Sequence, residues 1–485
     1  MASVAGAQTL TLSGSALVVP QKFQKYYDSA QTVNLPSGFT ASVYYTGALV
    51  SPRFMGFAPD GNLCVADDNL GTIFEILDSN GTGDTAIAIA TNTENAHSLA
   101  FHRGSLFAAS TNRIWRYDHP NASGIYSNPT LFIDSLGSTA EGSTNHTTRT
   151  LLFDDVTQAL YISDGSACNA CRENEDDTER GTILRFDTDG KHRSVYATGL
   201  RNAVGLALDS THALWATVAE RNDQGEDVPG DLVTAIDSNR FYGWPLAYGN
   251  HQWDDFSLDS EYEALLPLTH EDSVNVANMR VPDGTEPAHS TPLGILYTEN
   301  TNLPAMYRHA FFVAIHGSYP GADGRFVANG SKIILLTNSS GVWTNEDFCT
   351  GFLTDSINYI RWARPAGIIM DRKGNVYFSD DNTSPHAPPA IFKISYNAND
   401  AVATAEHSLA VDVVQNGSTA DIRVNNYSGS VPNVSLYDIM GRERKVVKQS
   451  AFTNEITLDL SPLEHGIYFV LIRTSDGTIL RSLLR

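Results

Sequence analysis

The chain has 485 residues, of which 42% are hydrophobic and 18% are charged, so its composition is that of a globular protein. This length exceeds what one ordinary compact core accommodates, and we therefore expect two domains. Lys and Arg number 32 against 55 Asp and Glu, and the resulting formal charge of -23 repels phosphate backbones and anionic membranes, which excludes nucleic acid as the expected partner.

Residues 1–34 are expected to form an N-terminal extension. The first eighteen residues have no basic region and only a broken apolar stretch, so no intact secretory signal is evident. No apolar run in the chain approaches the length of a transmembrane segment. We therefore expect no transmembrane segment.

Residues 35–395 repeat one pattern: a small residue, a short apolar run, a Gly or Asp turn and then an alternating strand. Six copies are anchored at small residues, and most of them are followed by a third strand such as Ile114-Trp-Arg-Tyr. The anchors are Gly56, Ser98, Thr150, Gly205, Gly294 and Gly367.

Such a repeat predicts an all-β fold, a six-bladed β-propeller of four-stranded blades. We expect the early strand Phe39-Thr-Ala-Ser-Val-Tyr-Tyr to close the ring by joining the last blade. Two stacked sandwiches would not explain a repeat that runs through the whole segment. Helical periodicity of any length is absent.

The cysteines are Cys64, Cys168, Cys171 and Cys349. Cys168-Asn-Ala-Cys171 lies in an acidic loop without a second CxxC, so a four-thiolate zinc site would lack ligands. A redox-active pair would be expected at a helix start, which this loop does not resemble. The sequence favours a local disulfide between Cys168 and Cys171, and it leaves open whether Cys64 and Cys349 pair.

The segment 396–407 is rich in Asn, Ala, Asp and Thr and is expected to be a linker. Residues 408–485 then show short alternating strands, which predict a small C-terminal β-sandwich domain. Its motifs resemble the sorting domain of the type IX secretion system of Bacteroidetes; the matching residues are Tyr437, Asp438, Gly441, Leu463, Gly466, Tyr468 and Phe469. The resemblance implies a secreted or cell-surface protein of a Bacteroidetes-like bacterium that engages the type IX machinery.

Cationic residues stand one to five positions ahead of the anchors, where the inner strands of a propeller open on one face of its channel. They are Arg53, His97, His146 with Arg149, Arg201 with Asn202, His289 and Arg364. In an acidic chain this set predicts an anionic ligand over the channel, and a planar polycarboxylate suits guanidinium groups. Each residue taken singly could instead cap a strand or pair with a carboxylate.

Several of these positions resemble the quinoprotein glucose and sorbosone dehydrogenases. The matching stretches are Gly199-Leu-Arg-Asn-Ala-Val-Gly-Leu-Ala, Leu214-Trp-Ala-Thr-Val-Ala-Glu-Arg-Asn-Asp, Phe241-Tyr-Gly-Trp-Pro and His146-Thr-Thr-Arg-Thr-Leu. The resemblance implies an oxidoreductase with a six-bladed propeller that binds pyrroloquinoline quinone (PQQ) and calcium and passes electrons from a sugar to an external acceptor. The substrate would be an aldose or a sorbosone-like aldehyde.

The same resemblance assigns roles to residues. His146 would be the catalytic base, and Arg149, Arg201, Asn202, Arg325 and Arg364 would bind the cofactor. Calcium would be held by backbone carbonyl oxygens in the turn at Asn222 and Asp223. For the side chains of Asp223, Asp227 and Asp231, a solvated acidic loop and direct calcium binding are equal alternatives. The chain departs from the family at Ala203, where proline is usual, and at Tyr319-Pro-Gly-Ala-Asp-Gly-Arg, which replaces Trp-Asn-Arg.

Two other functions stay open. A calcium-dependent sugar lactonase would also be a six-bladed propeller, but it would need carboxylates and amides around the channel, where this chain has mainly Arg and His. A non-catalytic carbohydrate-binding propeller would suit the sorting domain, because a fold does not determine a function. Dye reduction with PQQ, calcium and a sugar would identify the dehydrogenase, and hydrolysis of a sugar lactone without dye reduction would identify the lactonase.

Overall fold

The computed structural model describes residues 10–27, 31–137, 146–173, 179–318, 327–381 and 387–398, and seven stretches of the C-terminal part: 410–416, 419–425, 433–438, 442–444, 447–452, 455–474 and 477–484. The chain divides into two compact units, Met1–Asp400 and Ala401–Arg485. Each unit is considered by itself.

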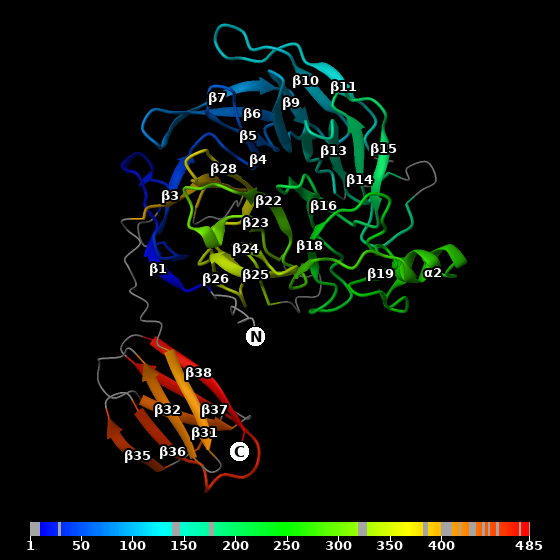
Figure 1. The fold of residues 1–485 in the computed structure, drawn as a ribbon. Coiled ribbons are helices and arrows are strands. Elements are labelled where there is room, and N and C mark those ends of the chain that lie inside the picture. Colours follow the sequence, from blue (N-terminus) through cyan, green and yellow to red (C-terminus); the bar gives the residue numbers. More distant parts are fainter. Residues whose placement is uncertain are drawn as a thin grey trace. The chain divides into compact units, whose positions relative to one another are not determined.

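In the described part of the first unit, six four-stranded antiparallel sheets follow one another along the chain, and Figure 1 shows them arranged around a common centre. The first sheet contains β4 (Pro52–Phe57), β5 (Leu63–Asp67), β6 (Thr72–Asp78) and β7 (Gly83–Thr91). The second contains β8 (Ser98–His102), β9 (Ser105–Ala109), β10 (Ile114–Tyr117) and β11 (Thr130–Ile133). The third contains β12 (Leu151–Asp154), β13 (Ala159–Asp164), β14 (Thr182–Asp187) and β15 (Ser194–Thr198). The next two are β16 (Ala203–Leu208), β17 (Leu214–Val218), β18 (Asp231–Ala235) and β21 (Gly284–Glu286); and β22 (Pro292–Thr298), β23 (Ala310–Ile315), β24 (Lys332–Ser339) and β25 (Val342–Cys349).

The sixth sheet confirms the predicted closure. It contains β28 (Pro365–Met370), β29 (Val376–Asp380) and β30 (Ala390–Tyr396), and its fourth strand is the early β3 (Phe39–Thr46). Phe39 lies opposite Tyr396 and Thr46 opposite Ala390. The predicted six-bladed propeller is therefore confirmed, with the two ends of the ring joined by hydrogen bonds within one blade.

The first strand of each blade borders the centre, because β4, β8, β12, β16, β22 and β28 contact one another in turn around the ring. Their anchors are small because these strands come close together. A Cβ on Gly205 would lie 2.1 Å from the carbonyl oxygen of Leu293, and a Cβ on Gly367 would lie 2.4 Å from that of Arg53. The recurring glycines thus follow from the close approach of neighbouring inner strands.

The second strand of each blade supplies the core. Every residue of β5, β9, β13, β17, β23 and β29 is buried. These strands are central in their sheets and have a neighbouring blade on each face, so both alternating sets of side chains are mainly apolar or small, and the Asp that ends three of the strands is the exception. The short apolar runs of the repeat are the sequence signature of this burial.

Hydroxyl groups link neighbouring blades near the centre. Thr217 Oγ1 accepts from Gly205 N at 2.8 Å and donates to the carbonyl oxygen of Leu293 in the next blade at 2.6 Å. Ser379 Oγ does the same between Gly367 N, at 2.8 Å, and the carbonyl oxygen of Arg53, at 2.6 Å. These bonds satisfy buried backbone groups at the blade interfaces.

Shorter elements surround the ring. They are β1 (Leu12–Ala16), η1 (Gln21–Phe23), β2 (Thr32–Pro36), β19 (Ala247–Tyr248), β20 (Gln252–Trp253), α1 (Ser260–Glu263), α2 (His270–Ala277), η2 (Ala305–Tyr307), β26 (Leu353–Asp355) and β27 (Ile360–Arg361). The sequence showed no helical periodicity, yet the structure contains α2, which begins with a capping box between Thr269 and Asp272. The helix is only two turns long, too short for a clear hydrophobic period.

The second unit contains two four-stranded antiparallel sheets. One contains β31 (Ala410–Asn416), β32 (Thr419–Asn425), β36 (Glu455–Asp459) and β35 (Val447–Phe452); the other contains β34 (Glu443–Arg444), β33 (Asn433–Asp438), β37 (Ile467–Thr474) and β38 (Gly477–Leu484). Ile422 and Leu458 are buried on the first, and Leu436 and Val470 on the second. Asp438 of the Tyr-Asp motif accepts hydrogen bonds from Arg442 Nε at 2.9 Å and Arg444 Nη2 at 2.6 Å.

Candidate active site at the channel mouth

The two ends of the inner strands define two faces of the propeller. At one end, here called the channel mouth, the chain enters each inner strand; at the other, the turn end, it turns back into the second strand. The predicted residues Arg53, His97, His146, Arg149, Arg201, Asn202, His289 and Arg364 all stand at the mouth end of their strands. Arg325 lies outside the described residues.

His146 is held in one orientation. Its Nδ1 lies 2.8 Å from the carbonyl oxygen of Ser166 and 3.0 Å from Ser166 Oγ. A carbonyl oxygen only accepts, so Nδ1 carries the proton and Nε2 keeps its lone pair when the ring is neutral. Burial and the charge of Arg201 lower the pKa of His146 to about 3, against the opposing effect of the Ser166 bond. The ring is thus a neutral base at ordinary pH.

A buried ionic cluster supports the His146 segment. Arg149 Nη2 lies 2.8 Å from Asp164 Oδ1, and both side chains are 0% exposed. Arg149 Nη1 donates to the carbonyl oxygen of His146 at 3.0 Å, while Arg180 donates to those of Gly165 and Ser166, each at 2.9 Å. Arg149 was predicted to bind the cofactor; these contacts suit a role in positioning His146.

Asn202 faces His146 across Gly165. A Cβ on Gly165 would lie 2.6 Å from both His146 Cβ and Asn202 Oδ1, so only glycine fits between them. Asn202 Oδ1 is buried and has no hydrogen-bond partner among the described residues. This unsatisfied amide oxygen lies beside a neutral imidazole, so a ligand or a water molecule is expected to donate a hydrogen bond to it.

Arg201 is anchored by the loop that the cysteines close. Cys168 and Cys171 form a disulfide, and between them Asn169 accepts from Arg201, with its Oδ1 at 2.7 Å from Nη2 and its carbonyl oxygen at 3.2 Å from Nε. Burial lowers the pKa of Arg201, although the neighbouring Glu220 opposes this. The sequence interpretation missed Asn169; its only signal was its place inside the cysteine loop.

Asn169 also connects this cation to the candidate metal loop. Its Nδ2 donates to Asp223 Oδ2, and Tyr262 Oη donates to Asp223 Oδ1. The Asp223 carboxylate is therefore engaged by protein groups. No described residue donates a hydrogen bond to the backbone carbonyl of Asn222 or Asp223, so these two oxygens are the ones suited to a calcium ion.

The other acidic residues of this loop differ in environment. Asp231 is buried, accepts from the backbone N–H groups of Glu220 and Thr291, each at 2.7 Å, and has its pKa raised to about 7 by burial. Asp227 is exposed. Asp231 thus has a structural role, and only Asp227 fits the alternative of a solvated acidic loop.

Arg364 and Arg53 lie beside a second ionic cluster, formed by Asp381 and His316, that the sequence interpretation did not identify. Asp381 Oδ1 lies 2.7 Å from His316 Nε2, and Asp381 Oδ2 pairs with Arg53. Burial would raise the pKa of Asp381, but the charges of His316 and Arg53 lower it overall. Arg364 Nη2 donates to the carbonyl oxygen of Gly317 at 2.7 Å, next to His316.

In three blades a buried Asp at the end of the second strand contacts the segment that enters the inner strand, and this Asp is visible in the sequence. Asp67 accepts from Val50 N at 2.7 Å, Asp164 pairs with Arg149, and Asp380 accepts from Arg364 N at 2.7 Å. All three are 0% exposed. Asp67 therefore holds the chain ahead of Arg53, whereas Asp164 and Asp380 hold Arg149 and Arg364 themselves.

A cavity of about 440 Å³ opens at the mouth beside the candidate metal loop. Glu226, Asp227, His289 and Asn329 line it together with four small or apolar residues. His289 Nε2 lies 2.8 Å from the carbonyl oxygen of Gly225, and its Nδ1 lies 3.4 Å from Asn222 Oδ1. The cavity therefore borders the loop of Asn222 and Asp223 through His289.

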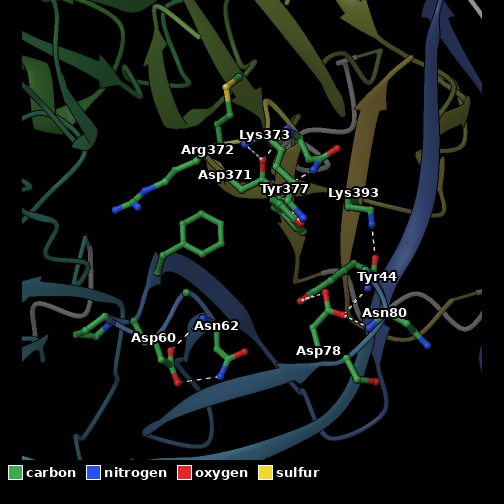
Figure 2. A pocket seen from close by; sticks show the side chains of 18 residues that line it. Tyr44, Asp60, Asn62, Asp78, Asn80, Asp371, Arg372, Lys373, Tyr377 and Lys393 are labelled. Atoms are coloured by element: carbon green, nitrogen blue, oxygen red, sulfur yellow. Dashed lines mark hydrogen bonds between the residues drawn. The ribbon is translucent and has the colours of Figure 1, made fainter. Parts of the chain in front are cut away.

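The turn end carries a larger hollow, of about 960 Å³, between the first and sixth blades (Figure 2). Its carboxylates serve their own turns: Asp371 accepts from Lys373 N and Asn375 N, each at 2.9 Å, and Asp78 accepts from Asn80 N at 2.9 Å. Tyr44 and Tyr377 donate to Asp78 and Asp371. The polar lining at this end is thus used to form turns.

Comparison with known proteins identifies the family and the fold. The TrAA12-like family matches residues 33–385, and a secretion system C-terminal sorting domain matches residues 416–484. The chain belongs to the TrAA12-like family. An uncharacterized protein of Borreliella burgdorferi is 21% identical over 363 residues, which cover 72% of this chain and 88% of that protein.

Among solved structures, the holo PQQ domain of the pyranose dehydrogenase from Coprinopsis cinerea is 20% identical, with a TM-score of 0.60 over 79% of this chain and 100% of that one. The PQQ-bound aldose sugar dehydrogenase from Streptomyces coelicolor is 17% identical, with a TM-score of 0.50 over 75% of this chain and 100% of that one. This TrAA12-like chain therefore has the fold of quinoprotein sugar dehydrogenases. No helix in the described part of the chain is long and apolar enough to cross a membrane.

Proposed function

We propose that this TrAA12-like protein is a secreted oxidoreductase that oxidises a sugar, an aldose or a sorbosone-like aldehyde, with PQQ and calcium and an external electron acceptor. The observation that carries the proposal is the neutral His146, with an unprotonated Nε2, beside Arg201 and the orphaned amide of Asn202. A general base and a cationic, amide-lined seat for a polycarboxylate are what this reaction requires.

The mouth residues fit the quinone. Arg201 and Arg364 place guanidinium charge at the mouth, Asn202 offers an amide that no described residue satisfies, and glycine at 165 keeps the space between Asn202 and His146 narrow. For calcium, the open carbonyl oxygens of Asn222 and Asp223 are hard ligands of the kind that this ion takes. When bound, the quinone supplies the hydride acceptor and calcium supplies Lewis-acid polarisation of its carbonyl.

The chain's own residues perform the proton chemistry. His146 Nε2 accepts the hydroxyl proton of the sugar, or of the hydrated form of an aldehyde substrate, as the carbon that carries this hydroxyl gives up its hydride. The Ser166 carbonyl oxygen holds the Nδ1 proton and stabilises the imidazolium that forms. Arg149, Arg180 and Asp164 keep the His146 backbone in place, so the lone pair stays directed at the substrate.

The sorting domain supports export through type IX machinery to the cell surface or the extracellular space, and we infer a Bacteroidetes-like source. A lactonase and a non-catalytic carbohydrate-binding propeller are less well supported. The buried Arg and His side chains at the mouth do not suit the oxygen-rich ligand set that a calcium lactonase requires.

The proposal is tested by reconstitution. The full chain is mixed with PQQ and calcium, and the absorption spectrum is followed while aldoses are added with a redox dye as acceptor. We expect the oxidised-quinone band to bleach on sugar addition and the dye to be reduced. Hydrolysis of a sugar lactone without any dye reduction would replace this function with that of a lactonase.

A further inference from the structure

We propose that Asn169 is a positioning residue that sets the affinity of the site for both the quinone and calcium. The inference rests on the proposed function, because it takes Arg201 as a quinone-binding residue and the turn of Asn222 and Asp223 as the calcium site. Asn169 is assigned no contact with either ligand. It acts through the residues that bind them, so that one amide connects the two parts of the site.

The polar groups of Asn169 are used at both parts of the site. Its Oδ1 accepts from Arg201 Nη2 at 2.7 Å, and its Nδ2 donates to Asp223 Oδ2. Its backbone carbonyl oxygen accepts from Arg201 Nε at 3.2 Å and from Trp244 Nε1 at 2.8 Å. An amide side chain has both an acceptor and a donor, so neither a carboxylate nor an ammonium group could hold the guanidinium and the carboxylate together.

Asn169 controls the one donor that Arg201 has left for a ligand. A guanidinium group carries five N–H donors in one plane. The carbonyl oxygens of Ala219 and Glu220 accept from Nη1 at 3.2 and 2.9 Å, and Asn169 accepts from Nε and Nη2. Within the described ranges, four donors are thus engaged, and the fifth lies on Nη2. Because this N–H shares its nitrogen with the bond to Asn169, the amide fixes the direction in which it points.

The calcium turn is oriented by the same amide together with a tyrosine. Tyr262 Oη donates to Asp223 Oδ1, and the Tyr262 ring is buried in a hydrophobic cluster with Ala170 and Leu265. The Asp223 carboxylate is therefore held by two donors, and the open carbonyl oxygens of Asn222 and Asp223 lie in the same turn. Groups that orient metal ligands without touching the ion commonly change metal affinity by about 10- to 100-fold when they are removed.

The loop that carries Asn169 is itself fixed. The disulfide between Cys168 and Cys171 closes the loop around this residue. Arg172, the next residue, donates to both carboxylate oxygens of Asp272 in α2, at 2.9 and 2.7 Å. The backbone of Asn169 is thus held on both sides, so its contacts with the two parts of the site are formed before any ligand binds.

The experiment measures two dissociation constants of the full chain: that of calcium by calorimetry without quinone, and that of PQQ by absorbance at saturating calcium. Asn169→Ala should raise the calcium Kd by about 10-fold or more, as for other groups that orient metal ligands. It should raise the PQQ Kd by about 3- to 10-fold, the effect of one hydrogen bond. Unchanged values for both ligands would overturn the proposal.

Asn300→Ala is the matched control. Asn300 is also a half-buried amide, and its Nδ2 donates to the carbonyl oxygen of Asp371 at 3.3 Å, at the turn end. This variant should bind both ligands like the wild type. Thermal melting of the two variants shows that each is folded. A control that loses as much affinity as Asn169→Ala would show a general loss of stability, and the proposal would fall.

A double-mutant cycle tests whether the quinone effect passes through Arg201. In the Arg201→Ala background, Asn169→Ala should cause no further rise in the PQQ Kd, because the group that it positions is gone. Tyr262→Phe tests the calcium part alone and replaces Asn169→Ala if that variant does not fold. It should raise the calcium Kd and leave the PQQ Kd at saturating calcium unchanged. Additive losses in the cycle, or unchanged calcium affinity in Tyr262→Phe, contradict the positioning role.

The same titrations separate this inference from the proposed function. If the wild type binds both ligands but no sugar bleaches the quinone, the dehydrogenase function fails, and the Kd values of the variants still decide the role of Asn169. If sugar bleaches the quinone and Asn169→Ala binds both ligands like the wild type, the inference fails and the function stands. If the wild type binds neither ligand, both are overturned.

Discussion

The two ends of the six inner strands use similar residues for different purposes. At the turn end, Asp60, Asp154, Asp209 and Asp371 each accept the backbone N–H two residues later, at 2.8 to 3.0 Å, and so close the turn into the second strand. At the mouth, buried carboxylates hold the chain ahead of cations, and the amide of Asn202 is left unsatisfied. Carboxylates occur at both ends, but a ligand is expected at the mouth, because a buried polar group there lacks a protein partner.

The largest expected effect separates a histidine of the mouth from one of the turn end. His146→Ala should lower kcat by a factor of about 10² to 10⁴, the usual contribution of a positioned base, while PQQ still binds. His212→Ala is the matched control, because His212 pairs with Asp154 at the turn end, 3.0 Å from Oδ1. Both variants are assayed by dye reduction with PQQ and calcium. Equal turnover in the two variants would remove His146 from the mechanism.

Carboxylates of the two ends should also differ in their contribution to stability. Asp164→Ala leaves the buried charge of Arg149 unpaired, and we expect a loss of about 3 to 5 kcal/mol in the free energy of unfolding. Asp371→Ala removes hydrogen bonds of the turn between β28 and β29, and should lower the free energy of unfolding by about 1 to 2 kcal/mol. Urea denaturation of the three proteins measures both values. Equal losses would show that the mouth cluster has no special role in the fold.

A third substitution tests the links between blades. Thr217→Val keeps the shape of the side chain but removes the hydroxyl that joins Gly205 N to the Leu293 carbonyl. We expect a cost of about 1 to 3 kcal/mol, because buried backbone groups lose their partner. Thr157→Val removes a hydroxyl that lies 2.6 Å from Asp154 at the turn end, and it provides the comparison. A larger loss for Thr157→Val would contradict the account.

The smallest effect concerns pH. Burial and the charge of Arg53 lower the pKa of His97 well below its usual value, and its ring nitrogens have no hydrogen-bond partner among the described residues. Below about pH 6.5 the unfolded chain therefore binds a proton there that the folded chain does not, and stability falls as the pH falls. His97→Leu should reduce this slope by about 1.4 kcal/mol per pH unit. Unfolding free energies at several pH values between 5 and 7 measure it; parallel curves for the two proteins would refute the assignment.

The sequence predicted the ring and its closure because both depend on local patterns. Small anchors such as Gly205, buried second strands and the early strand from Phe39 are visible as short repeated motifs. The positions of His146, Arg201 and Asn202 at one face follow from the same repeat. These features need no knowledge of contacts between distant side chains.

The networks around the site could not be predicted in this way. Asn169, Asp381 and Arg180 act through contacts with residues far away in the sequence, such as Asp223 and His316. An Asp ends three of the six second strands, but its role becomes clear only when the structure shows which mouth segment lies beside it. Arg149 shows the same limit, since its place ahead of an anchor suggested a ligand contact, and its ion pair with the distant Asp164 could not be read from the sequence.

The central claim is that the mouth, and not the turn end, binds the quinone. PQQ titrations in the presence of calcium, followed by absorbance, would compare the wild type with Arg201→Ala, Arg364→Ala and the turn-end variant Arg372→Ala. We predict a tenfold or greater rise in the Kd for the first two, the loss of about 1.5 kcal/mol or more expected for a hydrogen bond to a charged group, and no change for Arg372→Ala. Unchanged affinity in both mouth variants, or a loss confined to Arg372→Ala, would contradict the account.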